Sequence, residues 1–315
     1  MLFSGVFCCF YRDINKYFIV RPSECFSGQT VIVISGKVSD CSMIVIESAG
    51  VSDVGKKRKG NEDSLFLDDN MGLYVVADGM GGHQAGEVAS LLVVKTMEDY
   101  IKRFKCGKTV EELADSDKTL SKEANRLISG INLSNQVVFQ ASRNKSSYRG
   151  MGATVSAVYF TEDTLIAANV GDSPIYLIRN GTIELLSVTH TVLAEQKAMN
   201  PSGASQLGRG FSHMLTRAMG IEDSVRADLC EIQCFKEDVV VIASDGLSDK
   251  LLPEDILEIL NHKPPGKACQ DLVDTANQRG GDDNITVIVI KVKAVNHART
   301  GVMGFIFKLI NMITK

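Results

Sequence analysis

The spacing of apolar residues along the chain separates segments with a strand pattern from segments with a helix pattern. Short strand-like runs cover residues 43–47, 64–67 and 73–77, and the last is almost wholly apolar, as in a strand buried on both faces. Apolar residues then recur at helical spacing over 85–104 and again over 120–141. We therefore expect two long amphipathic helices that pack side by side.

The chain then returns to strands. The β-forming runs 153–160, 165–169, 175–179 and 182–186 predict an antiparallel meander, and Asn180-Gly181 is a strong signal for a hairpin between the last two. Further strands are expected near the end, at 226–233, 238–243 and 284–292. Two more helices are expected there, one that begins at Pro253 and another that covers 267–278. Helices and strands come in blocks and do not alternate strictly, which favours an α+β layered sandwich over a doubly wound parallel sheet.

Composition narrows the class of protein. With 315 residues and 44% apolar content, the chain can bury a full core, and we expect one large domain with short appendages. A formal net charge of −4 gives no reason to expect nucleic acid as a partner. The eight cysteines form no metal-ligand cluster and are typical of free thiols in a reducing cytoplasm. No apolar run reaches the ~18 residues of a spanning helix and no secretory signal is present, so we expect a cytoplasmic protein.

Two end segments differ in residue composition from the chain between them. Residues 1–42 are rich in cysteine and aromatic residues, and are either an extension with a strand at 30–35 or upstream sequence before a natural start at Met43. Residues 296–315 form an apolar tail with basic residues near its apolar ones, so it can lie at a membrane surface, dock a partner or pack on the domain itself. The main domain is expected to cover 43–295.

Acidic residues stand beside strand ends or turns at four places, as Glu62-Asp63, Asp78-Gly79, Asp245-Gly246 and Asp282-Asp283. If the fold brings them together, like charges raise one another's pKa unless cations neutralise them. Oxygen ligands without His or Cys select hard ions such as Mg²⁺ or Mn²⁺. Two such ions about 3.5–4 Å apart can lower the pKa of a bridging water towards about 7 and clamp the oxygens of a phosphoryl displacement. The planar guanidinium of Arg58 can hold the oxygens of a phosphate. Together, the acidic residues and Arg58 predict a phosphohydrolase site.

The joint pattern resembles the metal-dependent Ser/Thr protein phosphatases of the protein phosphatase 2C family, in their compact bacterial form. The resemblance extends from about residue 43 to 295 and is carried in order by DVGKKRKGNEDSL, VVADGMGGHQAGEVAS, GMGATVSA, ANVGDSPIY, HMLTRAMG, VVVIASDGLSD and GGDDNITVIVI. It implies a four-layer α/β/β/α sandwich in which helices flank two central antiparallel β-sheets.

The resemblance also implies a role for each matched acidic residue. Asp78 would bridge two Mn²⁺ or Mg²⁺ ions. Glu62 and the Gly79 carbonyl would complete the coordination of one ion, and Asp245 and Asp283 that of the other. These five positions are therefore the expected two-metal site.

Further positions would serve the substrate and a weaker ion. Asp63 would hydrogen-bond a metal-bound water, and Arg58 would bind the substrate phosphate. Asp172, with Asp245 and Asp249, matches the place where members of the family bind a third, weaker metal.

Some positions depart from the family pattern. Animal relatives place a general-acid His after the bridging Asp-Gly, whereas Met80 stands here as in bacterial members, so we expect metal-bound water to protonate the leaving group and not His83. Pro174 replaces the Arg of GDSR, which leaves its effect on the third site open. Thr189-His190-Thr191 replaces Asp-His-Ser and is expected to be tolerated structurally. Residues 200–212 lie where the family carries a variable flap.

The expected function is release of phosphate from phosphoserine and phosphothreonine of proteins, by a water or hydroxide that bridges the two ions. Such an enzyme, expected to be a monomer, would reverse the action of a Ser/Thr kinase. The sequence does not separate this role from that of a phosphatase dedicated to one regulator. The alternative is a catalytically silent protein that keeps the fold as a binding or regulatory module. Loss of Asp78, Asp245 or Asp283 would favour that alternative, and all three are present.

Two other functional hypotheses fit the sequence poorly. A nucleotide-binding P-loop would use the glycines after Asp78, and Gly81 and Gly86 have the right separation, but Glu87-Val88 replaces the required Lys-Ser/Thr. A Ser-His-Asp hydrolase would need a Gly-x-Ser-x-Gly turn, which the sequence lacks. Ser173 is therefore interpreted as a turn residue.

Overall fold

The structure is a computed structural model that describes residues 12–13, 16–17, 43–81, 85–105, 117–200, 211 and 213–296. The predicted strand at 30–35, the tail from 299 onward, His83 and nearly all of the 200–212 loop lie outside the described residues. Strands β1 (Arg12–Asp13) and β2 (Lys16–Tyr17) pair only with each other. The other elements belong to one unit, residues 42–298.

The first sheet of this unit has six antiparallel strands. Its order is β11-β8-β7-β5-β4, and the short β6 pairs with β5. The strands are β4 (Asp63–Asp68), β5 (Leu73–Met80), β6 (Gly152–Ala153), β7 (Val155–Thr161), β8 (Thr164–Val170) and β11 (Asp228–Gln233).

The second sheet has five antiparallel strands in the order β10-β9-β12-β13-β3. They are β3 (Met43–Asp53), β9 (Ile175–Arg179), β10 (Thr182–Leu185), β12 (Val239–Ala243) and β13 (Ile285–Asn296). The predicted hairpin at Asn180-Gly181 forms, with positive φ at both residues. The predicted single meander is wrong, because β7 and β8 lie in the first sheet whereas β9 and β10 lie in the second.

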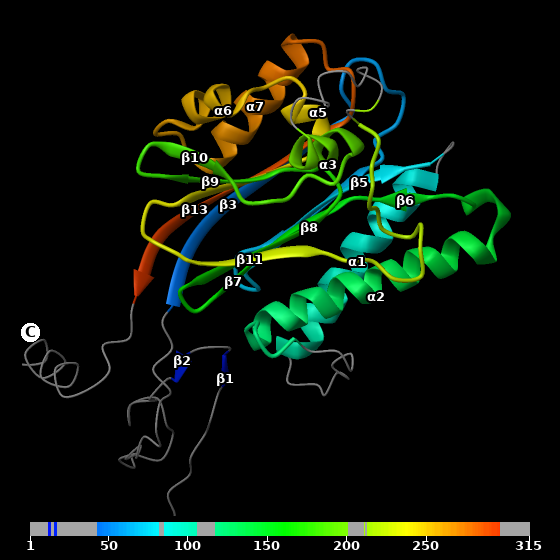
Figure 1. The fold of residues 1–315 in the computed structure, drawn as a ribbon. Coiled ribbons are helices and arrows are strands. Elements are labelled where there is room, and N and C mark those ends of the chain that lie inside the picture. Colours follow the sequence, from blue (N-terminus) through cyan, green and yellow to red (C-terminus); the bar gives the residue numbers. More distant parts are fainter. Residues whose placement is uncertain are drawn as a thin grey trace, which may run out of the picture. The chain divides into compact units, whose positions relative to one another are not determined.

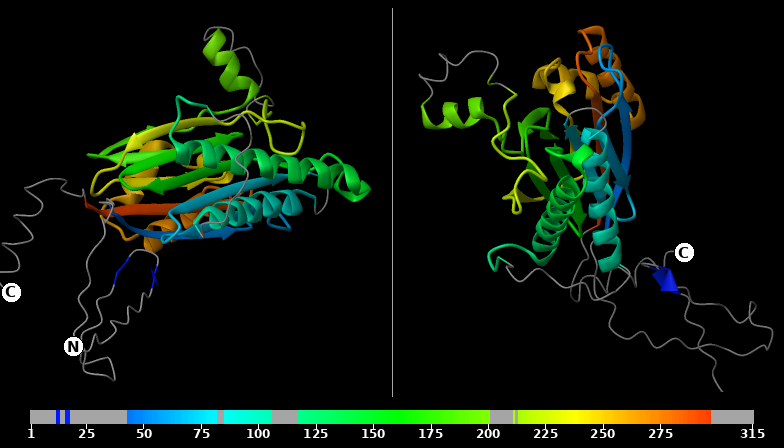
Figure 2. Two further views of the ribbon diagram at one scale, coloured as in Figure 1. Left: turned by 90° about the horizontal axis from the view of Figure 1, so that it is seen from below. Right: turned by 90° about the vertical axis from the view of Figure 1, so that its right-hand side faces the viewer.

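Helices cover the outer face of each sheet (Figure 1, Figure 2). Helices α1 and α2 pack side by side below the first sheet, and α6 and α7 lie over the second, so the predicted four-layer sandwich is confirmed. The helical segments are α1 (Ala85–Lys105), α2 (Lys122–Asn144), the 3₁₀ turn η2 (Ser146–Tyr148), α3 (Val192–Met199), α5 (Asp245–Ser248), α6 (Pro253–Leu260) and α7 (Pro265–Gln278). Within the described part of the chain, none is long and apolar enough to cross a membrane.

Three apolar cores hold the layers together. One lies between α1, α2 and the first sheet, with Met97 and Ile131 fully buried. The second lies between the two sheets, with Tyr74 and Ile288 fully buried. The third lies under α6 and α7. Because both faces of β5 are covered, its run of apolar residues is buried throughout, as the sequence predicts.

Candidate active site

The pairing of β4 with β5 brings two of the predicted acids together. Asp63 begins β4 and lies directly opposite Asp78 near the end of β5. The backbone N–H of Gly79 also donates to the Glu62 carbonyl at 3.1 Å. The register of one antiparallel pair therefore fixes four of the predicted residues relative to one another.

The start of α1 closes over Glu62 and Gly79. A Cβ atom on Gly86, in the first turn of α1, would lie 2.4 Å from Oε2 of Glu62 and 2.8 Å from the Gly79 carbonyl oxygen. Only glycine therefore lets the helix approach these two oxygens. A carboxylate at a helix N-terminus is also stabilised by the helix dipole. The two oxygens that the resemblance assigns to one ion thus lie together in a cradle that any side chain would fill.

Asn284 holds the loop before β4 against the start of β13. Its side-chain amide donates to the carbonyls of Val54 (3.0 Å) and Gly60 (2.9 Å), and its Oδ1 accepts from the N–H of Glu62 (2.9 Å). Asn284 is nearly fully buried, with 4% of its surface exposed. No role for Asn284 was predicted from the sequence, although its place directly after Asp283 was a usable signal.

The same loop carries Arg58 towards Asp283. Nη2 of Arg58 donates to Oδ2 of Asp283 at 2.7 Å, and this bond raises the pKa of the guanidinium. Both side chains are partly exposed, 51% for Arg58 and 33% for Asp283. Among the described residues, only Asp283 engages the Arg58 side chain, so its remaining N–H groups can meet an anion at the edge of the site.

Asp245 begins the short helix α5, which follows β12, and Asp249 caps its C-terminal end. A Cβ atom on Gly246 would lie 2.0 Å from the Asn284 carbonyl oxygen, so glycine is needed for α5 to pack against the start of β13. His213, which the sequence analysis did not single out, has its Nδ1 3.7 Å from Oδ2 of Asp249 and 4.0 Å from Oδ2 of Asp245.

Asp172 stands on the turn where the chain crosses from β8 to β9 and so from one sheet to the other. Gly171 before it has φ +111° and donates its N–H to Nδ1 of His190 at 3.0 Å. Nε2 of His190 lies 2.7 Å from Oδ2 of Asp228. His190 is buried, which lowers its pKa, so the neutral ring accepts at Nδ1 and donates at Nε2. The motif that departs from Asp-His-Ser therefore anchors the Asp172 turn.

Thr154 links this turn to the end of β5. Its Oγ1 accepts from the N–H of Asp78 at 3.0 Å and lies 2.9 Å from Oγ of Ser173. Ser173 is 1% exposed and is held as a turn residue, as interpreted from the sequence. The buried hydroxyl pair joins the strand that carries Asp78 to the turn that carries Asp172.

Burial raises the pKa of the acids at this place. It raises the pKa of Asp63 to about 6 and that of Asp172 to about 7. It raises the pKa of Asp78 well above its usual range, and the charges of Asp63 and Asp245 raise it further. The pKa of Asp245 is raised by burial and by Asp283. Charged forms of these acids are therefore costly unless cations neutralise them.

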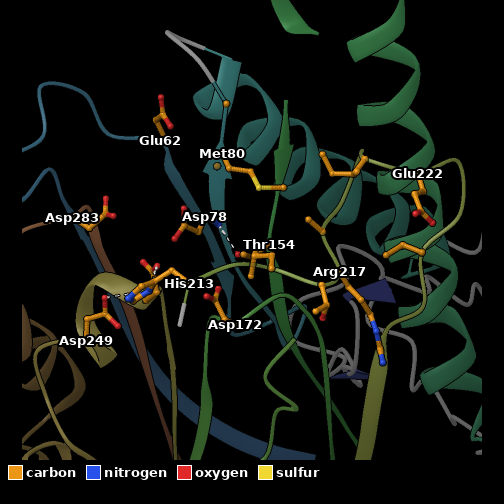
Figure 3. Close-up of a pocket in the computed structure, with 18 of the residues that line it drawn as sticks. Glu62, Asp78, Met80, Thr154, Asp172, His213, Arg217, Glu222, Asp249 and Asp283 are labelled. Carbon is orange, nitrogen blue, oxygen red and sulfur yellow. Dashed lines mark hydrogen bonds and ion pairs between the residues drawn. The ribbon is translucent and has the colours of Figure 1, made fainter. Parts of the chain in front are cut away.

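The predicted residues surround one cavity of about 890 Å³. Eight of the nine line it, and the ninth, Asp63, is buried opposite Asp78 with 8% of its surface exposed. Figure 3 shows Asp78, Asp172 and Asp283 directed into this cavity. The structure thus brings together residues from five separate segments of the chain.

Comparison with known proteins now decides the family. The family model for protein phosphatase 2C matches residues 56–279. The chain belongs to the protein phosphatase 2C family. The serine/threonine phosphatase stp of Listeria welshimeri is 32% identical over 253 residues, which cover 79% of this chain and 96% of the relative.

Solved structures of this family agree with the fold. The catalytic domain of the serine/threonine phosphatase PstP in complex with two manganese ions has a TM-score of 0.68 and 28% identity, and the match covers 80% of this chain and 100% of that chain. The Streptococcus agalactiae serine/threonine phosphatase has a TM-score of 0.66 and 31% identity, with 79% and 100% covered. The predicted family, fold and enzyme class, a protein Ser/Thr phosphatase, are therefore confirmed.

The donor set of this protein phosphatase 2C member fits hard divalent cations. All donors contributed by the predicted residues are oxygens, which Mg²⁺ and Mn²⁺ prefer. Neither oxygen of buried Asp63 has a hydrogen-bond partner of good geometry among the described residues. The cradle at Gly86 brings the Glu62 carboxylate and the Gly79 carbonyl together where no side chain fits.

The cavity also contains residues that the sequence analysis did not assign. Its wall between β6 and β11 is formed by residues 215–226, among them Arg217 and Glu222 (Figure 3). Nη1 of Arg217 pairs with Oδ2 of Asp228 at 2.8 Å, so Arg217 stabilises the wall. The motif HMLTRAMG marked this segment in the sequence, but neither its spacing nor its composition indicated which side chains face the cavity.

Proposed function

We propose that the protein hydrolyses phosphoserine and phosphothreonine in proteins, with two Mn²⁺ or Mg²⁺ ions as cofactors. The observation that carries the proposal is the gathering of acids with raised pKa around one cavity, with the guanidinium of Arg58 held beside them by Asp283. Such a group of carboxyls destabilises the fold in the absence of cations, and its position next to Arg58 suits a phosphate ester. Divalent-cation dependence is also supported by the two-manganese complex of PstP.

Five residues would hold the two ions. Asp78, between the others, would bridge them, with Glu62 and the Gly79 carbonyl on one side and Asp245 and Asp283 on the other. When bound, the ions neutralise these carboxylates and lower the pKa of a water molecule, so that it can attack phosphorus. A third, weaker site would use Asp172 with Asp245 and Asp249. His213 lies beside these three residues and offers a nitrogen donor.

The remaining residues would orient the substrate and the water. Arg58 is held by Asp283 and would donate its free N–H groups to two oxygens of the phosphate. Asp63, buried next to Asp78, would accept a hydrogen bond from the attacking water and so orient it. Met80 has no proton to give, so the proton for the serine or threonine leaving group comes from water.

Phosphoproteins are the substrate class that this site supports, and reversal of a Ser/Thr kinase is the expected cellular role. A monomer in the cytoplasm, with peripheral membrane contact through the apolar tail at 296–315, stays a prediction. Sedimentation with lipid vesicles, with and without residues 299–315, tests the membrane contact. Equal partitioning of the two forms would exclude it.

The decisive experiment measures phosphate release from phosphoserine and phosphothreonine peptides by the purified chain. We expect release with Mn²⁺ or Mg²⁺ and none after chelation, with recovery when the ion is restored. A protein that binds two Mn²⁺ ions in titration calorimetry yet releases no phosphate would contradict the enzyme. It would favour the alternative of a silent binding module.

A further inference from the structure

The cavity extends well beyond the acids that would hold ions. Its volume of about 890 Å³ is in the range of sites that enclose a drug-sized ligand, and a phosphate group alone occupies a small part of it. The part beyond Asp78 is lined by Met80, Ile221, Val225 and Arg226. Figure 3 shows the Met80 side chain between the acidic residues and Glu222. This part of the cavity is therefore continuous with the phosphate end.

Two apolar side chains meet on the surface of β6. A Cβ atom on Gly152 would lie 2.6 Å from Cε of Met80 and 3.0 Å from Cδ1 of Ile221. Gly152 is also the β6 partner of Met80 in the pairing with β5. Met80 and Ile221 thus rest on the same bare stretch of backbone and form one apolar floor. Ile221 is nevertheless 49% exposed, so this floor faces the open cavity.

The segment that carries Ile221 is fixed by hydrogen bonds on both sides. The side chain of Asn135 on α2 accepts from the N–H of Gly220 at 2.7 Å and donates to the Glu222 carbonyl at 3.0 Å. Met219 and Ala153 exchange both backbone hydrogen bonds, at 2.8 and 3.2 Å. A surface held in this way needs little ordering when it binds a ligand, which favours affinity.

Charged side chains with no assigned task stand at the rim of this floor. Glu222 and Arg226 are exposed, and their side chains make no hydrogen bond or ion pair that involves another described residue. An apolar centre with a polar rim is the usual anatomy of a surface that binds a protein segment. In an extended substrate chain each residue spans at most about 3.5 Å, so the residues next to the phosphorylated one stay close to the phosphate end of the cavity. This reach suits a subsite next to the phosphorylated residue.

We propose that Met80 and Ile221 form a subsite for an apolar side chain that neighbours the phosphoserine or phosphothreonine of a protein substrate. The proposal rests on the proposed function and names a preference within it. Leu, Ile, Val or Met at the neighbouring position would cover the floor and remove its apolar surface from water. Burial of apolar surface equivalent to about one and a half methylene groups corresponds to a gain of about five- to tenfold in kcat/KM.

The test compares phosphopeptides that differ at one position. A phosphothreonine peptide with glycines around the phosphorylated residue is the reference, and Leu replaces Gly in turn at the two positions on each side. We expect one of these four peptides to be hydrolysed by the Mn²⁺-loaded enzyme with a kcat/KM about five- to tenfold above the reference. The ratio of the two values is the readout, so a partial loss of overall activity in a variant does not affect it.

Variants assign the preference to the floor. Ile221→Ser and Met80→Ser should each bring the ratio to within about twofold of one, whereas Ile221→Leu should keep it. Leu252→Ser removes an apolar side chain of similar size that is 66% exposed and does not line the cavity, and should keep the ratio. A wild-type ratio of one for all four peptides, or a ratio that survives both serine variants, would overturn the subsite. Absence of hydrolysis of every peptide, including the reference, would instead overturn the proposed function.

Discussion

Two pairs of acids near the cavity differ in character, namely Asp63 with Asp78 on the first sheet and Asp282 with Asp283 before the last strand of the second. On the first sheet, Asp63 is 8% exposed, and Asp78 opposite it has a pKa raised by burial. Neither is paired with a basic side chain in the described part of the chain. In the turn before β13 of the second sheet, Asp283 is one-third exposed and is bonded to Arg58. Asp282 beside it is paired with Lys57 and Lys250, which lower its pKa to about 2.

This difference separates acids that need an added cation from acids that the protein itself neutralises. Buried carboxylates without a partner are costly, and a bound ion is the remaining way to compensate them. Exposed carboxylates with a basic partner are already stable in water. Asp63 and Asp78, together with the mostly buried Asp245 after β12, are therefore the acids on which ion binding depends most, whereas Asp283 supplies a further ligand and Asp282 an outer rim.

The largest effect is expected for Asp78→Asn. The change removes the central charge of the group, and we expect kcat/KM for a phosphopeptide to fall at least about a thousandfold, or about 4 kcal/mol. The metal-free variant should be more stable than the metal-free wild type, because a buried charge with raised pKa is lost. Thermal unfolding in the presence of a chelator checks the second point. A variant that retains activity but unfolds earlier would show that Asp78 has only a structural role.

A smaller effect is expected for Gly86→Ala, which tests the cradle on the side of the first sheet. The added methyl would lie 2.4 Å from Oε2 of Glu62, so the carboxylate must move. Displacing one ligand should weaken Mn²⁺ binding about 10–100-fold, measured by titration calorimetry. Gly60→Ala is the matched control, since no atom lies within 4 Å of its new Cβ, and should bind Mn²⁺ like the wild type. Equal affinity of both variants would mean that Glu62 and the Gly79 carbonyl hold no ion.

The sequence alone predicts the elements and the acids of the site well, because periodicity and motif order are local properties. The long helices α1 and α2 and the strand β5 follow from apolar spacing, and the acids follow from their places at strand ends. What the sequence does not show is which strands share a sheet. The turn at Asp172 carries the chain from one sheet to the other, and only long-range pairing of β9 with β12 decides this. The same holds for Asn284 and His213, whose partners are distant in sequence.

A pH effect of a few degrees in melting temperature should show that the buried acids are not neutralised in the metal-free protein. The folded pKa of Asp63, about 6, lies above its ordinary value of 3.8, so its contribution to stability is present at low pH and is lost as the pH rises through about 6. For Asp172 the loss occurs through about 7. The metal-free protein should therefore melt at higher temperature at pH 6 than at pH 8. Saturating Mn²⁺ at pH 8 should restore the lost stability. A metal-free protein that is less stable at pH 6 would contradict the unneutralised state of these acids.

The smallest effect is expected for Asp282→Asn, which separates the outer rim from the ligands. Asp282 is 44% exposed, does not line the cavity, and pairs only with Lys57 and Lys250 among the described residues. Exposed ion pairs contribute little to stability and are screened by salt, so the variant should melt with the wild type in 0.5 M NaCl. Its kcat/KM should stay within about twofold of wild type, whereas Asp283→Asn, one residue later, should lose activity strongly. Two adjacent acids of one turn would then differ because one is directed into the cavity and the other is held by lysines outside it. Equal losses of kcat/KM in the two variants would show that Asp282 also reaches the ions. Asp282 would then be a ligand and not part of an outer rim.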